Sequence, residues 1–170
     1  MVLFDATMLS LLFHPGAKAP TDADGQPISR ARERVEYLVE TLEKSKTKII
    51  IPTPALAELL VLAGDAGPKY LEQIEDKAFF KVSDFDKRAA IEVSLQIREA
   101  MGSGNKKAGS VSTWAKVKFD RQIVAIAKVE SITAVYSDDK DLAKYAKAQE
   151  IEVRGVNDLP IPPMKQEPLL

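Results

Sequence analysis

The sequence contains no cysteine, and His14 is its only histidine. The absence of cysteine excludes disulfide bonds and thiolate metal sites, and it is compatible with a reducing cytoplasm. A single histidine cannot build a histidine metal centre, so we interpret His14 as incidental to function. Any metal site in this chain must therefore rely on oxygen ligands.

The sequence also lacks long apolar runs and a large net charge. No run approaches the roughly 20 apolar residues that a membrane helix needs, so we expect no contact with a membrane. The first residues carry no basic region and reach an acid at Asp5, unlike a signal peptide, and we expect a cytoplasmic protein. A formal net charge of −1 excludes histone-like binding of nucleic acids but not a local basic groove.

The 170 residues, of which 45% are hydrophobic, suffice for one domain with a sizeable core. Short apolar runs alternate with amphipathic runs along the chain, which is the pattern of an α/β protein. We expect strands at residues 2–4, 48–52, 79–82, 132–136 and 152–154, and helices at 6–13, 29–46, 67–76, 86–101, 119–129 and 139–148, with a further helix that Thr53 caps and Pro54 begins. This order predicts a three-layer α/β/α sandwich with a central parallel sheet.

We expect the domain to span residues 1–159 and a proline-rich, extended or disordered tail to span 160–170. Residues 14–27 and 102–110 are predicted loops. The second, rich in glycine and lysine, is typical either of a loop that holds a polyanion or of a solvated linker. Arg30, Arg32 and Arg34 favour a solvated helix face over contacts to phosphates.

Four acids occupy strand ends or helix starts in this prediction: Asp5, Glu58, Asp120 and Asp139. The carboxyl ends of parallel strands lie along one edge of a sheet, where ligand crevices open. Each acid also has a plain structural interpretation. Asp5 is a good helix cap, and Glu58 fits the solvent face of its helix. An ionised Glu58 among alanines and leucines is nevertheless costly unless it is paired or bound to a metal.

Four carboxylates gathered at one edge would repel one another and raise their pKa values, and a divalent cation removes that conflict. Oxygen ligands favour Mg²⁺ or Mn²⁺ over zinc. Such a site can activate water and clamp a phosphodiester during in-line attack, without any protein nucleophile. The pattern therefore favours phosphodiester hydrolysis.

The chain resembles the PIN-domain ribonucleases, and in particular the toxin nucleases of VapC-type toxin–antitoxin pairs. The segments that carry the resemblance follow the family's order and are residues 2–7, Pro54–Glu58, Phe119–Ala127 and Ala134–Leu142. The resemblance implies a metal-dependent endoribonuclease that acts on RNA, pairs into a homodimer and has an antitoxin partner.

The resemblance also implies roles for particular residues. Asp5, Glu58, Asp120 and Asp139 match the family's acidic quartet, and the quartet implies a Mg²⁺ or Mn²⁺ ion. Thr7 and Ser137 match hydroxyl positions that orient an acid or a water molecule. Asp138 stands at a polar position beside Asp139 and competes with it for the metal. Lys116 or Lys118 is expected to face substrate phosphate.

Other functions remain open at this point. Residues 14–48 and 102–110 are longer than in compact toxins, which leaves a stand-alone PIN protein in RNA processing as an alternative. A non-catalytic binding protein that keeps the PIN scaffold is another, although the intact quartet argues against it. A phosphoryl-accepting receiver domain is disfavoured because Asp5 has no adjacent acid and Ile51 is followed by Pro52, Thr53 and Pro54.

Overall fold

The computed structural model describes residues 1–102, 104, 107 and 110–163. Within these residues, one all-parallel sheet has the strand order β3-β2-β1-β4-β5. Its strands are β1 (Val2–Phe4), β2 (Ile49–Pro52), β3 (Phe80–Ser83), β4 (Ala134–Tyr136) and β5 (Glu152–Arg154). The first strand lies at the centre, where Val2 pairs with Ile49 on one side and Ala134 on the other.

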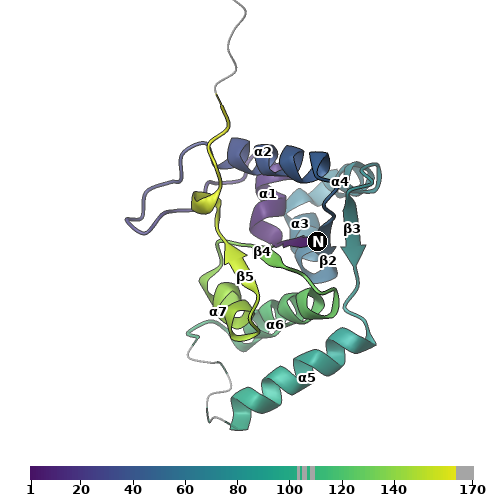
Figure 1. Cartoon of the computed structure of the whole chain (residues 1–170), viewed down its shortest axis with the longest axis vertical. Helices are drawn as coiled ribbons and strands as arrows, with labels where there is room; N and C mark the ends of the chain where they lie inside the picture. Colours follow the sequence, from purple (N-terminus) through teal and green to yellow (C-terminus); the bar gives the residue numbers. More distant parts are fainter. Residues whose placement is uncertain (103, 105–106, 108–109, 164–170) are drawn as a thin grey trace, which may run out of the picture.

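Helices cover both faces of the sheet. The helices are α1 (Ala6–Phe13), α2 (Ala31–Lys44), α3 (Thr53–Ala63), α4 (Gly67–Glu75), α5 (Lys87–Gly102), α6 (Trp114–Val129) and α7 (Lys140–Ala148), with short 3₁₀ turns η1 (Gly64–Ala66) and η2 (Val156–Asp158). Helices α1 to α4 pack together on one side, whereas α5 to α7 lie on the other (Figure 1). The predicted three-layer α/β sandwich with a parallel sheet is therefore confirmed.

The central strands are apolar because both of their faces are buried. Leu3, Phe4, Ile50 and Val135 have no exposed surface, as expected for parallel strands that are covered by helices on two sides. Helix α6 is buried on several sides as well, in keeping with its nearly all-round apolar surface. Its residues Ile123–Ala127 all lie in the core. Of the four predicted site acids, Asp5 directly follows β1 and Asp120 lies within α6.

The predicted start of α6 is wrong. The helix begins at Trp114 rather than at residue 119, and the Thr113 side chain caps it by accepting a hydrogen bond from Lys116 N at 3.3 Å. Buried Val117 anchors this additional turn to the core. Asp120 consequently lies inside the helix, not at its start, and its side chain projects one turn after that of Lys116.

The predicted cap of α3 is also wrong. Thr53 is the first residue of the helix, and Pro52 occupies the cap position without a side-chain hydrogen bond. The Thr53 hydroxyl instead accepts a hydrogen bond from Phe85 N at 3.1 Å. This contact ties the start of α3 to the segment that follows β3.

Two of the three arginines, Arg32 and Arg34, do not lie on a solvated face, whereas Arg30 is exposed as expected. Arg34 is only 8% exposed, and its guanidinium donates to the carbonyls of Ser29 (3.0 Å) and Leu159 (2.6 Å). Arg32 donates to the carbonyl of His14 at 2.5 Å. These two side chains thus join α2 to distant parts of the chain. Their partners are backbone carbonyls, and not the solvent or phosphate that the sequence suggested.

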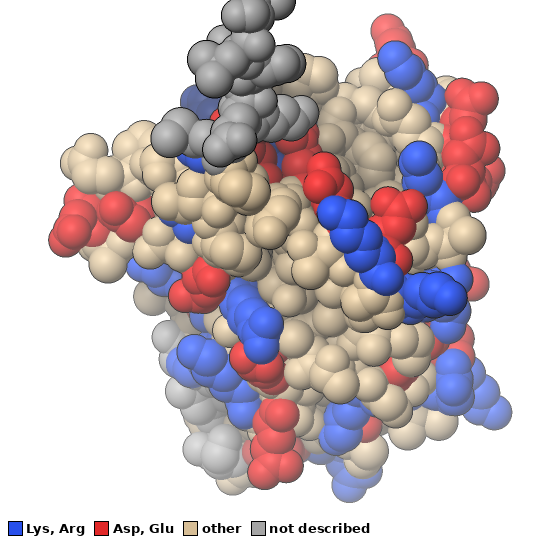
Figure 2. All heavy atoms as spheres, turned by 45° about the horizontal axis from the view of Figure 1, so that its top comes forward, with Lys and Arg blue, Asp and Glu red and all other residues tan. Residues whose placement is uncertain are grey.

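Parts of two predicted segments lie outside the described residues: 103, 105–106 and 108–109 of the loop, and 164–170 of the tail. None of the helices in the described ranges has the length and apolar character required to cross a bilayer. Basic and acidic side chains are interspersed on the face shown in Figure 2, in keeping with the net charge of −1.

Candidate metal centre

The acids come together at the carboxyl edge of the sheet. Asp5 directly follows β1, and residues 137–139 directly follow the neighbouring strand β4. Because Phe4 pairs with Tyr136, the two strands end side by side. Helices α3 and α6, which carry Glu58 and Asp120, pack against each other at the same edge. The topology therefore brings four segments that are far apart in sequence to one place.

Asp5 is both a helix cap and a buried acid of this centre. It is 3% exposed, and its Oδ1 accepts a hydrogen bond from Met8 N at 3.0 Å at the start of α1. Its Oδ2 accepts a hydrogen bond from the Ser137 hydroxyl. Burial raises the pKa of Asp5 to about 7, against the lowering effect of these two hydrogen bonds.

Ser137 connects Asp5 to Asp139. The buried Ser137 hydroxyl donates to Asp5 and accepts a hydrogen bond from Asp139 N at 3.0 Å. The Asp139 carboxylate then caps α7, because its Oδ1 accepts from Asp141 N (2.9 Å) and Leu142 N (3.1 Å). The other oxygen of Asp139, Oδ2, points toward α6.

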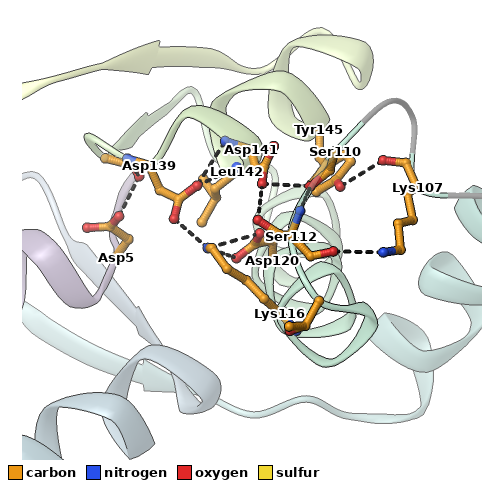
Figure 3. Close-up of polar contacts among 12 residues, drawn as sticks. Asp5, Lys107, Ser110, Ser112, Lys116, Asp120, Asp139, Asp141, Leu142 and Tyr145 are labelled. Carbon is orange, nitrogen blue, oxygen red and sulfur yellow. Dashed lines mark hydrogen bonds and ion pairs between the residues drawn. The ribbon is translucent and has the colours of Figure 1, made fainter.

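Asp120 and Asp139 face each other across the ammonium group of Lys116 (Figure 3). The Lys116 Nζ atom lies 3.2 and 3.3 Å from the two oxygens of Asp120 and 2.5 Å from Asp139 Oδ2. Asp120 is 4% exposed, and burial raises its pKa to about 6 although Lys116 acts to lower it. Burial by itself would lower the pKa of Lys116, but its hydrogen bond to Asp139 and the two carboxylate charges raise it.

The structure adds Asp141, to which we assigned no role from the sequence. Ligand oxygens of Asp120, Asp139 and Asp141 all lie within 4.8 Å of one another. Asp141 also accepts hydrogen bonds from the hydroxyls of Ser110 (2.7 Å) and Ser112 (2.6 Å), and these bonds lower its pKa. The only sequence signal is its spacing of two from Asp139, which is equally typical of an exposed acid in a first helical turn.

Glu58 lies at the margin of this group. Its side chain is exposed, as the solvent-face interpretation expected, and it is not part of the acidic triad. Partial burial raises its pKa, Lys116 acts to lower it, and Asp139 raises it further. Glu58 therefore shares the electrostatic field of the centre. It also lines an apolar cavity of about 360 Å³ together with Ala57, Val61, Leu62 and Phe119.

Asp138 points away from the triad. Both of its carboxylate oxygens lie 3.2 Å from Val156 N, at the start of η2. A Cβ atom at Gly155 would come within 2.8 Å of the nearer oxygen, so the absence of a side chain there allows this approach. Asp138 and Asp139, which the sequence could not rank, therefore have different surroundings.

The remaining predicted site residues are less closely engaged. Lys118 lies over the Trp114 ring, with its Nζ atom 5.8 Å from the ring centroid, while Lys116 enters the acidic group. Thr7 is half-buried in the first turn of α1, two residues after Asp5. The expected roles of Thr7 and Lys118 stay predictions.

The donor set fits a hard divalent cation. Carboxylate oxygens from the triad are the ligands that Mg²⁺ and Mn²⁺ prefer, and the triad has no softer ligand. The Lys116 ammonium already acts as a stand-in cation between two of its members. The centre could therefore hold a divalent ion at Asp120, Asp139 and Asp141.

The fold and these acids together define a three-layer α/β protein with an acidic candidate metal centre at the carboxyl edge of its sheet. A family model described as PIN domain matches residues 27–148, and the chain belongs to this family. The matched range includes Glu58, Asp120 and Asp139, whereas Asp5 precedes it.

Solved structures with the same fold include proteins from DNA-bound complexes and a toxin. The FitAB complex bound to an IR36 DNA fragment has a TM-score of 0.59 and 19% identity, with coverage of 94% of this chain and 98% of that chain. VapBC2 from Rickettsia felis, bound to a promoter DNA fragment, has a TM-score of 0.58 and 14% identity, covering 91% and 98%. VapC20 of Mycobacterium tuberculosis, described as a toxin that cleaves the sarcin–ricin loop, has a TM-score of 0.52 and 15% identity, covering 85% and 94%. At these identities the likeness shows the fold alone. No curated protein matched the chain.

Proposed function

We propose that this protein is a metal-dependent endoribonuclease that hydrolyses RNA phosphodiester bonds at the centre formed by Asp5, Glu58, Asp120 and Asp139. One observation carries the proposal. In this PIN domain, Asp120 of α6 and Asp139 at the cap of α7 converge on one cation position, with Lys116 Nζ 2.5 Å from Asp139 and 3.2 Å from Asp120.

In this proposal, Asp120 and Asp139 hold the metal and Asp141 supports them, since these three offer oxygens within 4.8 Å of one another. Asp139 is preferred over Asp138 because Asp138 is hydrogen-bonded to Val156 N. Glu58 completes the centre from its margin on α3. A Mg²⁺ or Mn²⁺ ion bound here would supply the Lewis acidity for attack of water on the phosphodiester.

Asp5 is a further metal ligand in the proposal, and Ser137 has a positioning role. Because burial raises the pKa of Asp5 to about 7, its carboxyl group holds a proton below neutral pH and becomes an anionic ligand as that proton leaves. The Ser137 hydroxyl keeps Asp5 and Asp139 in register by bonding to both residues. Thr7 is proposed as a further hydroxyl that orients an acid or a water molecule.

We further propose that the protein is the toxin of a toxin–antitoxin pair that acts in the cytoplasm, with an antitoxin protein as partner. The support is the similarity of fold to VapBC and FitAB complexes. A homodimer is proposed as well, because apolar side chains are exposed on three helices, α3, α5 and α6. They are Val61, Leu62, Ile91, Leu95 and Phe119. Sedimentation analysis of the purified protein tests the dimer.

Cleavage of end-labelled single-stranded and structured RNA tests the nuclease. The wild-type protein should cut RNA in Mg²⁺ or Mn²⁺ and not in EDTA. The Asp120→Asn variant should lose about 100-fold or more of this activity, since loss of a ligand exceeds the usual effect of losing a residue that supports one. Asp76→Asn is the matched control, because this exposed acid follows α4 at the opposite edge of the sheet. Cleavage that survives Asp120→Asn would point to a contaminating nuclease.

Calorimetry with Mn²⁺ distinguishes a non-catalytic protein from the two nuclease candidates. A stand-alone PIN protein in RNA processing would bind Mn²⁺ and cut RNA, but it would have no antitoxin. A non-catalytic protein on a PIN scaffold would bind no Mn²⁺ at the centre. Absence of heat on titration with Mn²⁺ would therefore favour the non-catalytic alternative.

A further inference from the structure

Lys116 is the cation around which the acids of this centre are arranged. Its Nζ atom contacts both oxygens of Asp120, at 3.2 and 3.3 Å, and Asp139 Oδ2 at 2.5 Å. Its charge also acts to lower the pKa of Glu58, against the raising effect of burial. One lysine thus acts on three members of the acidic quartet, and Figure 3 shows its ammonium group between the two aspartates.

The oxygens that Lys116 contacts are those available to a divalent ion. Asp139 Oδ1 already accepts hydrogen bonds from two backbone groups of α7, so Oδ2 is the oxygen that faces the centre. This same oxygen lies 2.5 Å from Lys116 Nζ. Two cations cannot share these short contacts without strong repulsion, because like charges at such distances oppose each other.

The ammonium group of Lys116 is also able to move out of the acidic centre. Its side chain is 42% exposed, whereas the Asp120 side chain is only 6% exposed, so the lysine reaches the acids from the solvent side. A four-carbon stem with rotatable bonds lets the ammonium group move while its backbone stays in α6. Two residues further along α6, Lys118 is directed to Trp114 and does not enter the centre.

We propose that Lys116 is a resident counter-cation that occupies the acidic centre in the metal-free protein and withdraws from Asp120 and Asp139 when a divalent ion binds. Lys116 thereby sets the metal affinity of the centre, and its withdrawn ammonium group lies at the entrance, where a phosphate of a polyanionic substrate arrives. This inference rests on the proposed metal centre and adds the competition between a residue of the chain and the ion.

Calorimetric titration with Mn²⁺ tests the competition in the full-length protein. Lys116→Met removes the charge and should tighten Mn²⁺ binding about tenfold, the factor expected when two ion pairs of ordinary strength no longer compete. Lys116→Arg keeps the charge and should leave the affinity within about twofold of wild type. Lys118→Met, which removes a neighbouring positive charge outside the centre, should also have little effect.

The outcomes separate this inference from the proposed function. Equal or weaker Mn²⁺ binding by Lys116→Met, with wild type still binding, would overturn the role of Lys116 alone. Tightening by Lys118→Met to the same extent would also overturn it, because the effect would then be one of general charge. Absence of binding in wild type and in every variant would overturn the metal centre and this inference together.

A second measurement follows the wild-type protein and uses a variant only to assign one signal. The side-chain ammonium resonance of Lys116 is followed by NMR during titration with Mg²⁺, with Lys116→Arg to assign the signal. Withdrawal from the two aspartates should move this resonance as the centre saturates. A resonance that stays in place while calorimetry reports Mg²⁺ binding would refute the withdrawal.

Discussion

Replacing Asp120 with asparagine should stabilise the metal-free protein at alkaline pH, because Asp120 is an acid whose burial is costly. Asp120 is 4% exposed, and burial is the main reason that its pKa rises from 3.8 to about 6. A group whose pKa is raised on folding contributes stability below its unfolded value, and this contribution is lost as the pH rises through the folded value. Above pH 6 the ionised form of Asp120 therefore opposes folding.

The shift sets the expected size of the effect. A rise from 3.8 to about 6 is roughly two units, which corresponds to about 3 kcal/mol at 1.36 kcal/mol per unit. Asparagine resembles the protonated acid in shape and carries no charge to desolvate. Asp120→Asn should therefore raise the free energy of unfolding at pH 8 by up to about 3 kcal/mol, whereas at pH 4 the gain should be close to zero.

Urea unfolding in EDTA at pH 4 and pH 8 measures this difference. In thermal unfolding at pH 8, the melting temperature of Asp120→Asn should exceed that of wild type by several degrees, at roughly 2–4 °C per kcal/mol. Asp76→Asn, an exposed acid, should change the stability by no more than about 0.5 kcal/mol at either pH. In excess Mn²⁺ the wild-type protein should become more stable than Asp120→Asn, since only the wild-type protein gains binding energy from the ion. A variant less stable than wild type at pH 8, or a gain of equal size at both pH values, would refute the reasoning.

Three further predictions follow from the same contacts. Ser137→Ala removes the hydroxyl that joins Asp5 to Asp139 and should weaken Mn²⁺ binding about tenfold by calorimetry; an unchanged affinity would remove its positioning role. In EDTA, the urea concentration at the unfolding midpoint of wild type should decrease as the pH is raised from 5 to 8, because the raised pKa values of Asp5 and Asp120 are about 7 and 6. Saturating Mg²⁺ should suppress this decrease. A midpoint that is flat or rises over this range in EDTA would contradict the assignment. Arg34→Met should lower the free energy of unfolding by about 2–4 kcal/mol, because it leaves buried carbonyl groups without their donor, and a loss below about 1 kcal/mol would mean that water replaces the guanidinium.

Much of the fold could be predicted because its signals are local. Ile49, Ile50 and Ile51 form a β-branched run bounded by a turn signal, and the observed strand β2 starts within one residue of the prediction. The short strand before Asp5 was likewise evident from Val2, Leu3 and Phe4. The start of α6 was missed because Val117 is the one residue from Trp114 to Lys118 that is buried, so the turn carries little apolar periodicity, although Thr113 before it is of a type that commonly caps helices.

The arginines show where local patterns mislead. Charge predicts exposure in most helices, and the sequence contains nothing that marks Arg34 as different. Its burial depends on the carbonyl of Leu159, which is 125 residues away in sequence. A partner at such a separation is brought to the arginine only by the tertiary fold.

The sequence by itself determined the alternation of strands and helices, the restriction to oxygen ligands, and the identity of the acids at the strand ends, because residue type and periodicity are local properties. Only the tertiary structure decided which oxygens face one another. It directs Asp138 to Val156 and Asp139 to Lys116, and it brings Asp141 within 4.8 Å of Asp120. These separations depend on how α6 and α7 pack on the sheet, since a few ångströms of displacement would separate a shared cation site into isolated surface acids.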